Sequence, residues 1–286
     1  DNAVRSAIKD QENAGVDVIS DGELRRETMV YFFSARIHGF DMQGRLKPIG
    51  NLDSNIRMPD PVVVDKVRSL GSLGMEDHFA FLRDNTRAHT KVCVTGPHML
   101  AKRATNEHYA SDRELVFDLA DILNADLKRV ADAGCELIQI DEPVWVGHPQ
   151  DMPWMVDAFN RLVSDVNAEI CVHVCYGNYQ LKRLFSGEYS ELFPALLEHS
   201  MSKEELIAEA ALSKNDHART STLLSELRQL TNDYKPPDWA DSSVRGLYHQ
   251  LEGLEADTLE HVHLENYVLF PSLAAQRKEA DGHKNS

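Results

Sequence analysis

The stretch Gly134-Cys-Glu-Leu-Ile-Gln-Ile-Asp-Glu-Pro143 decides the fold class that we predict for this chain. A helical pattern precedes it, which begins at the capping box Ser111-Asp-Arg-Glu114 and ends at Gly134. The residues that follow form a nearly continuous apolar run that ends at Asp141. An apolar run of this length directly after a helix is typical of a buried strand in a parallel sheet.

Three further segments have the same character, and helical patterns separate them along the chain. They are Val16-Asp-Val-Ile-Ser-Asp-Gly-Glu23, Lys91-Val-Cys-Val-Thr-Gly-Pro97 and Glu169-Ile-Cys-Val-His-Val174. Four strands that alternate with helices predict an α/β fold with a parallel sheet and right-handed crossovers.

Polar residues collect at the carboxyl end of every predicted strand. They are Asp21 and Glu23, Thr95, Asp141 and Glu142, and then His173 and Cys175. In an α/β barrel the loops after the strands converge on one face and form the active site, so this pattern favours a functional edge. The alternative is that the acids cap the following helices, where negative charge meets the positive end of the helix dipole.

The run Cys171-Val-His-Val-Cys-Tyr176 places potential metal ligands on one side of a strand, because alternate residues face the same way. A thiolate and an imidazole are suitable zinc ligands, but zinc normally takes four ligands. The alternative is that these side chains only pack in the core, which is common for cysteine.

Four motifs together carry a family resemblance, and they occur in the family's order. They are Ala14-Gly-Val-Asp-Val-Ile-Ser-Asp-Gly-Glu23, Thr95-Gly-Pro-His-Met-Leu100, Ile138-Gln-Ile-Asp-Glu-Pro143 and His173-Val-Cys-Tyr-Gly-Asn-Tyr179. With them, residues 1–197 resemble the C-terminal catalytic domain of cobalamin-independent methionine synthases, in its short archaeal and bacterial relatives.

The resemblance implies a TIM barrel that binds zinc and transfers a methyl group to the sulfur of homocysteine. His173 and Cys175 match two zinc ligands of the family, while Glu23 and Asp141 match the acids that hold the amino group of homocysteine. Zinc would keep the substrate thiol as a thiolate, which is the nucleophilic form. The methyl donor would be a folate or a corrinoid.

The chain also departs from the family pattern. Members supply a glutamate and a second cysteine to zinc from later strands, whereas this sequence has no cysteine after Cys175. We expect the first barrel strand to precede residue 1 and the last three to be absent, so that about four βα units of a partial barrel remain. Exposed strand edges invite pairing with another chain, and we therefore expect self-association.

From about residue 203 the strand pattern gives way to two long amphipathic helices, which Tyr234-Lys-Pro-Pro237 separates. In the first helix we expect an inward stripe that includes His217, whether the helix starts before Leu206 or at Ser213. The inward stripe expected in the second helix consists of Leu247, Leu251, Leu254, Thr258, His261, Glu265 and Val268.

An imidazole and a carboxylate one turn apart on an inward face cost desolvation unless something binds them. His261 and Glu265 therefore point to a metal, and a hydrogen-bonded buried His–Glu pair is the alternative. Residues from about 209 to 275 resemble the last two helices of the hemerythrin-like domain in iron-sulfur cluster repair proteins, through Asn215-Asp-His217, Leu230-Thr-Asn232 and His261-Val-His-Leu-Glu-Asn-Tyr-Val-Leu-Phe-Pro271. This resemblance implies that His217, His261 and Glu265 bind iron as half of a di-iron site.

The composition of the 286 residues limits the partners. With 46 acidic and 30 basic side chains the formal charge is −16, which disfavours nucleic acid and membrane surfaces as partners. The first residues lack the pattern of a secretory signal, and four cysteines are consistent with a reducing compartment, so we expect a cytoplasmic protein.

Taken together, the sequence predicts two partial domains, residues 1–197 and residues 198–286. The leading expectation is a zinc-dependent methyltransferase that acts on homocysteine, because the barrel-like part is the longer one. The alternatives are a di-iron protein that repairs iron-sulfur clusters under oxidative or nitrosative stress, and a fusion in which neither activity survives.

Overall fold

The computed structural model describes residues 1–48, 57–179, 182–187, 191–192 and 203–264, which fall into two compact units, Asp1–Leu196 and Leu197–Ser286. Among the described residues, every β-strand belongs to the first unit, whereas the second consists of helices and the turns between them. No helix among the described residues is long and apolar enough to cross a membrane.

The centre of the first unit is a four-stranded parallel sheet. Its strand order is β1 (Val18–Ile19), β4 (His89–Thr95), β6 (Leu137–Asp141) and β7 (Glu169–His173). These are the four strands that the sequence predicts. Ile138 and Ile140 of β6 are fully buried, as expected for an inner strand of a parallel sheet. Within the described residues β1 and β7 are the outer strands, so the partial barrel that the sequence predicts is confirmed.

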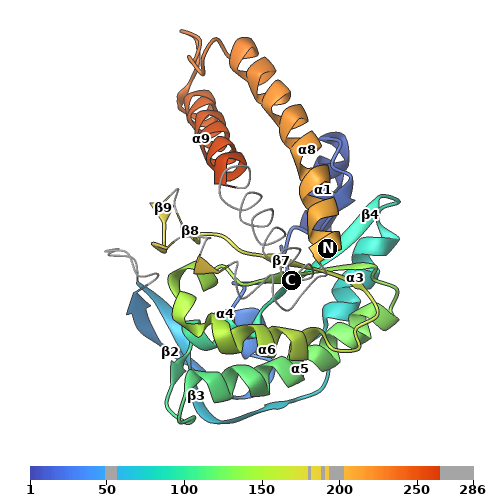
Figure 1. Ribbon diagram of the computed structural model, residues 1–286, viewed down its shortest axis with the longest axis vertical. Coiled ribbons are helices and arrows are strands. Elements are labelled where there is room, and N and C mark those ends of the chain that lie inside the picture. The colour runs from blue at the N-terminus through green and yellow to red at the C-terminus, as the bar shows by residue number, and fades with distance from the viewer. Residues whose placement is uncertain (49–56, 180–181, 188–190, 193–202, 265–286) are drawn as a thin grey trace, which may run out of the picture. The chain divides into compact units, whose positions relative to one another are not determined.

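Helices connect and cover the strands. They are α1 (Asn2–Asn13), α2 (Tyr31–Ser34), α3 (Met75–Asp84), α4 (Pro97–Arg103), α5 (Asp112–Asp132) and α6 (Met152–Val163), with short 3₁₀ turns at Trp145–Gly147 and Pro149–Asp151. The longest, α5, begins at the predicted cap, where the Ser111 side chain accepts a hydrogen bond from the Glu114 N–H. The apolar residues that recur along α5 from Leu115 to Val130 are buried. The helix lies beside α6 (Figure 1), where the Asn124 side chain donates to the Leu162 carbonyl.

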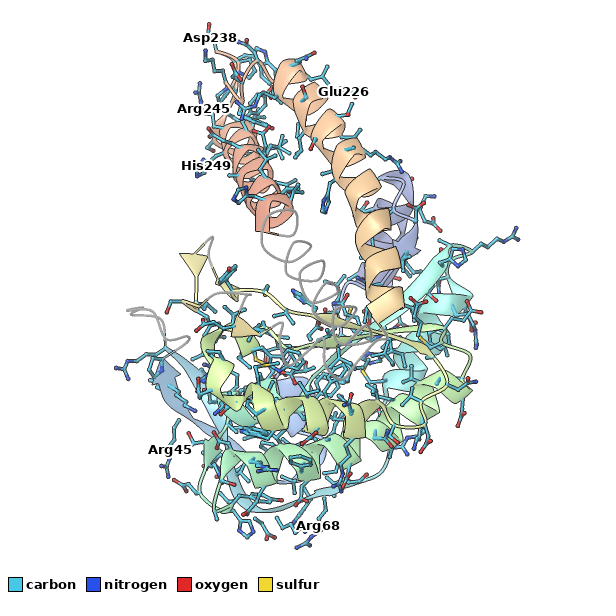
Figure 2. The ribbon with its side chains drawn as sticks, viewed as in Figure 1. Arg45, Arg68, Glu226, Asp238, Arg245 and His249 are labelled. Atoms are coloured by element: carbon cyan, nitrogen blue, oxygen red, sulfur yellow. The ribbon has the colours of Figure 1, made fainter. Side chains whose placement is uncertain are left out.

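A long antiparallel hairpin was not predicted from the sequence. Its strands are β2 (Ile37–Pro48) and β3 (Arg57–Ser69), and β3 also pairs in parallel with β5 (Thr105–Asn106). Figure 2 shows Arg45 and Arg68 pointing outward from this hairpin. The apolar Val62 and Val63 of β3 are buried. A second small hairpin pairs β8 (Asn178–Tyr179) with β9 (Lys182–Arg183).

The second unit contains two helices, α8 (Lys203–Leu230) and α9 (Ser242–Leu264). The prolines separate them as predicted, and α8 runs through Ser213 rather than beginning there. The Arg228 guanidinium of α8 donates to the buried Glu255 carboxylate of α9, which ties the helices together. His249 points away from α8 (Figure 2) and is exposed.

The predicted inward stripe is right for α8 and shifted for α9. His217, Thr220, Leu224 and Leu227 are the less exposed positions among the α8 side chains that the structure describes. In α9 the expectation for Leu247 and Leu254 is wrong, because both are more than half exposed. The less exposed positions of α9 are Val244, Tyr248, Leu251, Glu255, Thr258 and Val262. Leu251 and Thr258 belong to both the predicted and the observed side, and the observed side includes Glu255, which pairs with Arg228 of α8.

Candidate active site

Three of the predicted polar residues lie side by side at the carboxyl ends of neighbouring strands. Thr95 of β4 is in register with Asp141 of β6, and Asp141 is in register with His173 of β7. Thr95 and Asp141 are buried, and the Thr95 hydroxyl donates to the Met29 carbonyl. The parallel sheet therefore brings together side chains that are far apart in the sequence.

The Asp141 carboxylate orients the His173 ring. Its Oδ1 lies 2.9 Å from His173 Nδ1 and also accepts a hydrogen bond from the Gln139 side chain at 2.7 Å. The carboxylate can only accept, so Nδ1 carries the hydrogen and Nε2 is left as the ligand atom of the imidazole. Hydrogen bonds to Asp141 and to Cys175 raise the pKa of His173 to about 10, so Nε2 carries a proton at neutral pH that a metal would have to displace on binding. An aspartate that holds the second nitrogen of a histidine is the usual partner of a metal-binding histidine.

Cys175 lies beside His173, as the alternation of the strand predicts. The two side chains are joined by a hydrogen bond, and the Gly177 N–H donates to Cys175 Sγ at 3.3 Å. Cys175 is partly exposed and not packed in the core, which argues against the alternative of simple core packing.

Glu23 stands on a tight turn that directs it toward the same edge of the sheet. Gly22 and Glu23 both have positive φ values, 68° and 56°, and the Asp21 side chain accepts a hydrogen bond from the Glu23 N–H. A positive φ is unfavourable for glutamate, so the surrounding structure holds this conformation in place. Burial and the nearby Asp141 and Asp21 carboxylates raise the pKa of Glu23, although Arg26 pairs with it at 2.9 Å.

Cys93 belongs to the same cluster and was not predicted from the sequence. Donor atoms of Glu23, Cys93 and Asp141 all lie within 4.8 Å of one another. Cys93 precedes Thr95 by two residues on β4, so the alternation that places Thr95 at the site also predicts the side of Cys93. Burial raises the pKa of the Cys93 thiol to about 12, which keeps it protonated at neutral pH.

The alternative that acids only cap local structure is correct for Glu142. Its carboxylate accepts the backbone N–H groups of His98 and Met99 at 2.9 and 2.8 Å, at the start of α4. Asp21 has a similar local bond to the Glu23 N–H. Glu142 therefore fixes the start of α4.

A cavity of about 780 Å³ opens beside the His173–Cys175 pair. Most of its wall is apolar, and the residues that line it come from the loop before α2, from β3, from α4 and from the segments after β6 and β7. They are Glu27, Thr28, Met29, Val30, Tyr31, Met58, Pro59, Asp60, Met99, Arg103, Pro143, Val144, His173, Cys175, Gly177, Leu184 and Phe185. No sequence pattern indicates this cavity, because β3 reaches it only through the unpredicted hairpin.

Of the three predicted iron ligands, the structure describes the side chain of His217 alone. His217 lies on the less exposed side of α8 and interacts with other groups of the chain. His261 is within α9, but its side chain and all of Glu265 lie outside the described residues. The proposed convergence of the three residues thus stays a prediction.

Comparison with known proteins identifies relatives of both parts. Residues 1–207 match the family model "Cobalamin-independent synthase, Catalytic domain", and residues 155–273 match the "Hemerythrin HHE cation binding domain". In the region where the two matches overlap, β7 is a strand of the parallel sheet, and α6 lies in the connection between β6 and β7.

Curated relatives carry the name methionine synthase. The chain is 37% identical to the methionine synthase of Sulfurisphaera tokodaii over 180 residues, covering 63% of this chain and 52% of the relative. It is also 37% identical to that of Saccharolobus solfataricus over 194 residues, covering 65% and 55%. The chain therefore spans about half the length of the curated relatives that it matches.

A solved structure has a similar fold. The B12-independent methionine synthase from Shewanella sp. W3-18-1, in complex with selenomethionine, superposes with a TM-score of 0.63 at 28% sequence identity. The match covers 70% of this chain and 61% of the Shewanella chain.

Proposed function

The chain belongs to the family of cobalamin-independent synthase catalytic domains, and on this basis we propose that its first unit serves a zinc-dependent transfer of a methyl group to the sulfur of homocysteine. The observation that carries the proposal is the contact between Asp141 and His173, with Cys175 next to His173. An oriented imidazole beside a partly exposed thiol is a donor pair that suits zinc. His173 and Cys175 would hold the metal, which when bound acts as a Lewis acid that keeps the substrate thiol deprotonated.

The chain's own residues would bind and orient the amino acid. Glu23 and Asp141 bring two carboxylates close together, and such a pair attracts an ammonium group. Both described hydrogen bonds of Asp141 go to Oδ1, which leaves Oδ2 to face the substrate. The selenomethionine bound to the Shewanella relative supports an amino acid with a sulfur-type side chain as ligand of this fold.

Methionine formation tests this proposal directly. The full chain, supplied with zinc, would be incubated with homocysteine and either methylcobalamin or 5-methyltetrahydrofolate, and methionine would be quantified by mass spectrometry. We expect Glu23→Gln to raise the KM for homocysteine about tenfold or more, since it removes a charge-assisted hydrogen bond. Glu136→Gln is the matched control, because Glu136 is exposed and precedes β6 at the opposite end of the sheet. An unchanged KM in Glu23→Gln would contradict the role of Glu23.

A second function is favoured by the match of residues 155–273 to a cation-binding domain. We propose that the α8–α9 pair binds iron through His217, His261 and Glu265, as in a di-iron protein for iron-sulfur cluster repair. Two copies of the chain would complete four helices, since isologous pairing brings identical surfaces together.

Iron content and oligomeric state test this second function together. After anaerobic reconstitution we expect iron in a dimer, and we expect His217→Ala to lose it. His249→Ala is the matched control, since His249 is exposed on the far side of α9. A monomer that takes up no iron, or equal iron in His217→Ala, would remove this proposal.

A further inference from the structure

A chain of three hydrogen bonds leads across three neighbouring strands to His173. Lys91 Nζ of β4 donates to Gln139 Oε1 of β6 at 2.8 Å. Gln139 Nε2 donates to Asp141 Oδ1 at 2.7 Å, and the same oxygen lies 2.9 Å from His173 Nδ1 of β7. Lys91 is in register with Leu137 and Asp141 with His173, so the alternation within β6 places all of these side chains on one face of the sheet.

The Gln139 amide can take only one orientation in this chain. The Lys91 ammonium only donates hydrogen bonds, so the amide atom that faces it is the oxygen. The Asp141 carboxylate only accepts, so the amide atom that faces it is the nitrogen. The reverse orientation would set two donors against each other at Lys91 and two acceptors at Asp141. Lys91 therefore fixes the direction in which Gln139 donates.

Gln139 in turn fixes the rotation of the Asp141 carboxylate. The torsion that turns a carboxylate about its Cβ–Cγ bond is broad, so a single contact with His173 does not decide which oxygen faces the ring. Two donors, from Gln139 and from His173, meet at Oδ1. Asp141 is only 3% exposed, so water does not readily replace either donor. Oδ1 is thereby committed to His173, and Oδ2 is left for another group.

The charge of Lys91 does not explain its place beside this site. Among the residues that the structure describes, Lys91 forms no ion pair with a carboxylate, and its hydrogen bond goes to the neutral amide of Gln139. An ammonium group on the same face of the sheet repels any cation that binds at His173. A direct electrostatic role of Lys91 would thus oppose metal binding, whereas a role through Gln139 and Asp141 would favour it.

We propose that Lys91 and Gln139 are positioning residues, which act through Asp141 and touch neither the metal nor the substrate. Lys91 orients the Gln139 amide, and the amide holds the Asp141 carboxylate with Oδ1 on His173 and Oδ2 free for the ammonium group of the amino acid. The inference rests on the proposed function, because that function places a metal at His173 and an amino acid at Asp141.

The sign of the change in zinc affinity distinguishes positioning from a direct effect of charge. Lys91→Met keeps the apolar stem and removes the ammonium group, so a direct effect alone would strengthen zinc binding. We expect Lys91→Met instead to weaken zinc binding about tenfold, as the loss of a group that supports a metal ligand does. Competition with a chromophoric chelator measures the affinity of the full chain.

Lys66→Met is the matched control for this substitution. Lys66 is an exposed lysine of β3 that pairs with Asp118, so its replacement should leave zinc binding unchanged. Zinc binding by Lys91→Met that equals or exceeds that of the unmodified chain would overturn the inference.

A double-mutant cycle tests whether Lys91 acts through Gln139. Gln139→Leu removes the donor to Asp141 at similar size and should weaken zinc binding about tenfold or more. In a chain that already carries Gln139→Leu, Lys91→Met should weaken zinc binding no further, because members of one hydrogen-bond network do not act additively. Additive losses would overturn the proposed order of contacts.

Homocysteine binding tests the second role of the Asp141 carboxylate. Calorimetric titration of homocysteine into the full chain at saturating zinc separates this role from zinc affinity. We expect Gln139→Leu to weaken homocysteine binding about tenfold, the effect of a lost hydrogen bond to a charged group. Equal homocysteine affinity in Gln139→Leu and in the unmodified chain would contradict the hold on Oδ2.

A measurement on the unmodified, metal-free chain covers the case in which the variants do not fold. Nuclear magnetic resonance of the chain with nitrogen-labelled glutamine and histidine, at a low temperature where exchange with water is slow, reports both side chains. We expect a nuclear Overhauser effect between a Gln139 Nε2 proton and the His173 Nδ1 proton, because both protons point at Asp141 Oδ1. Absence of this effect would overturn the inference.

The outcomes separate this inference from the proposed function. If the unmodified chain forms methionine and Lys91→Met binds zinc as tightly, the positioning role is wrong and the proposed function stands. If zinc binding falls in Lys91→Met and in Gln139→Leu as expected but the unmodified chain forms no methionine, the positioning role is supported and the proposed function is wrong.

Discussion

Asp141 and His173 contact each other at the ends of two neighbouring parallel strands, with Asp141 Oδ1 2.9 Å from His173 Nδ1. The contact fixes which ring nitrogen carries the hydrogen and which nitrogen faces a metal. The organisation of the proposed zinc site depends on this pair.

We predict that Asp141→Asn weakens zinc binding about 10- to 100-fold, the usual effect of losing the partner of a metal-binding histidine. Competition with a chromophoric chelator measures the affinity. Asp132→Asn provides the control, since Asp132 is exposed at the end of α5. Equal zinc affinity in Asp141→Asn and in the unmodified chain would show that Asp141 does not act through His173.

The buried His98 contributes to the pH dependence of the stability of the first unit. Burial lowers the pKa of His98 from 6.5 to about 4, although its Nε2 lies 3.0 Å from Asp151. Between pH 6.5 and pH 4 the unfolded chain therefore binds a proton that the folded chain does not, so stability falls as the pH falls. From the difference between the two pKa values we expect His98 to contribute a loss of about 2 kcal/mol between pH 7 and pH 5. Burial raises the pKa values of Glu142 and Asp60 to about 8 and about 6, which acts in the opposite direction, so the contribution of His98 is the difference between the unmodified chain and His98→Gln.

Urea unfolding at the two pH values, followed by tryptophan fluorescence, measures this loss. The pKa of Asp151 is lowered to about 2, through its hydrogen bonds to His98 and Lys102 and against the effect of burial, so Asp151 titrates below this window. His98→Gln removes the titrating group, so between pH 7 and pH 5 its stability should rise by about 2 kcal/mol relative to that of the unmodified chain. An equal change of stability in the two proteins would contradict this role of His98.

Gly96 is required by the Glu142 carboxylate. A Cβ at position 96 would collide with the Glu142 side chain, which is held by the His98 and Met99 N–H groups. We predict that Gly96→Ala destabilises the first unit by about 1–3 kcal/mol, the usual cost of overpacking. In a double-mutant cycle with Glu142→Ala, the cost of Gly96→Ala should become much smaller, because the colliding group is gone. Additive effects of the two substitutions would contradict the collision.

The pairing of Arg228 with Glu255 should hold the α8–α9 pair together. Arg228→Ala leaves the buried Glu255 carboxylate without this partner, so we expect the amides of α9 to exchange hydrogen faster. Hydrogen exchange followed by mass spectrometry reports this effect segment by segment. Arg219→Ala, on the exposed side of α8, should leave the exchange unchanged. Identical exchange in both variants would show that the ion pair does not hold α9 against α8.

The parallel sheet could be predicted from the sequence because each strand is a short apolar run that follows a helix. Ile138 and Ile140 are fully buried, and the capping box at Ser111 starts α5 where expected. The candidate residues at the strand ends followed from the same reasoning, since parallel strands place their carboxyl ends together.

The hairpin and the cavity could not be predicted in this way. Pro48, Pro59 and Pro61 and several charges interrupt the alternation of β2 and β3, so no regular pattern marks them as strands. The contact of Asp60 with Arg103 joins positions 43 residues apart, and only the folded chain brings them to one wall. In α9 the less exposed side includes the charged Glu255, which pairs with Arg228, and a pattern of apolar residues alone does not predict a charged residue there.

Zinc content, measured by elemental analysis of the full chain, tests the central proposal most directly. The unmodified chain would be compared with Cys175→Ser and with Cys171→Ser, a matched change of a second partly exposed thiol that lies in β7. We predict about one zinc per chain in the unmodified protein and in Cys171→Ser, and its loss in Cys175→Ser, since one thiolate ligand is removed. No zinc in the unmodified chain, or equal zinc in Cys175→Ser, would contradict the account.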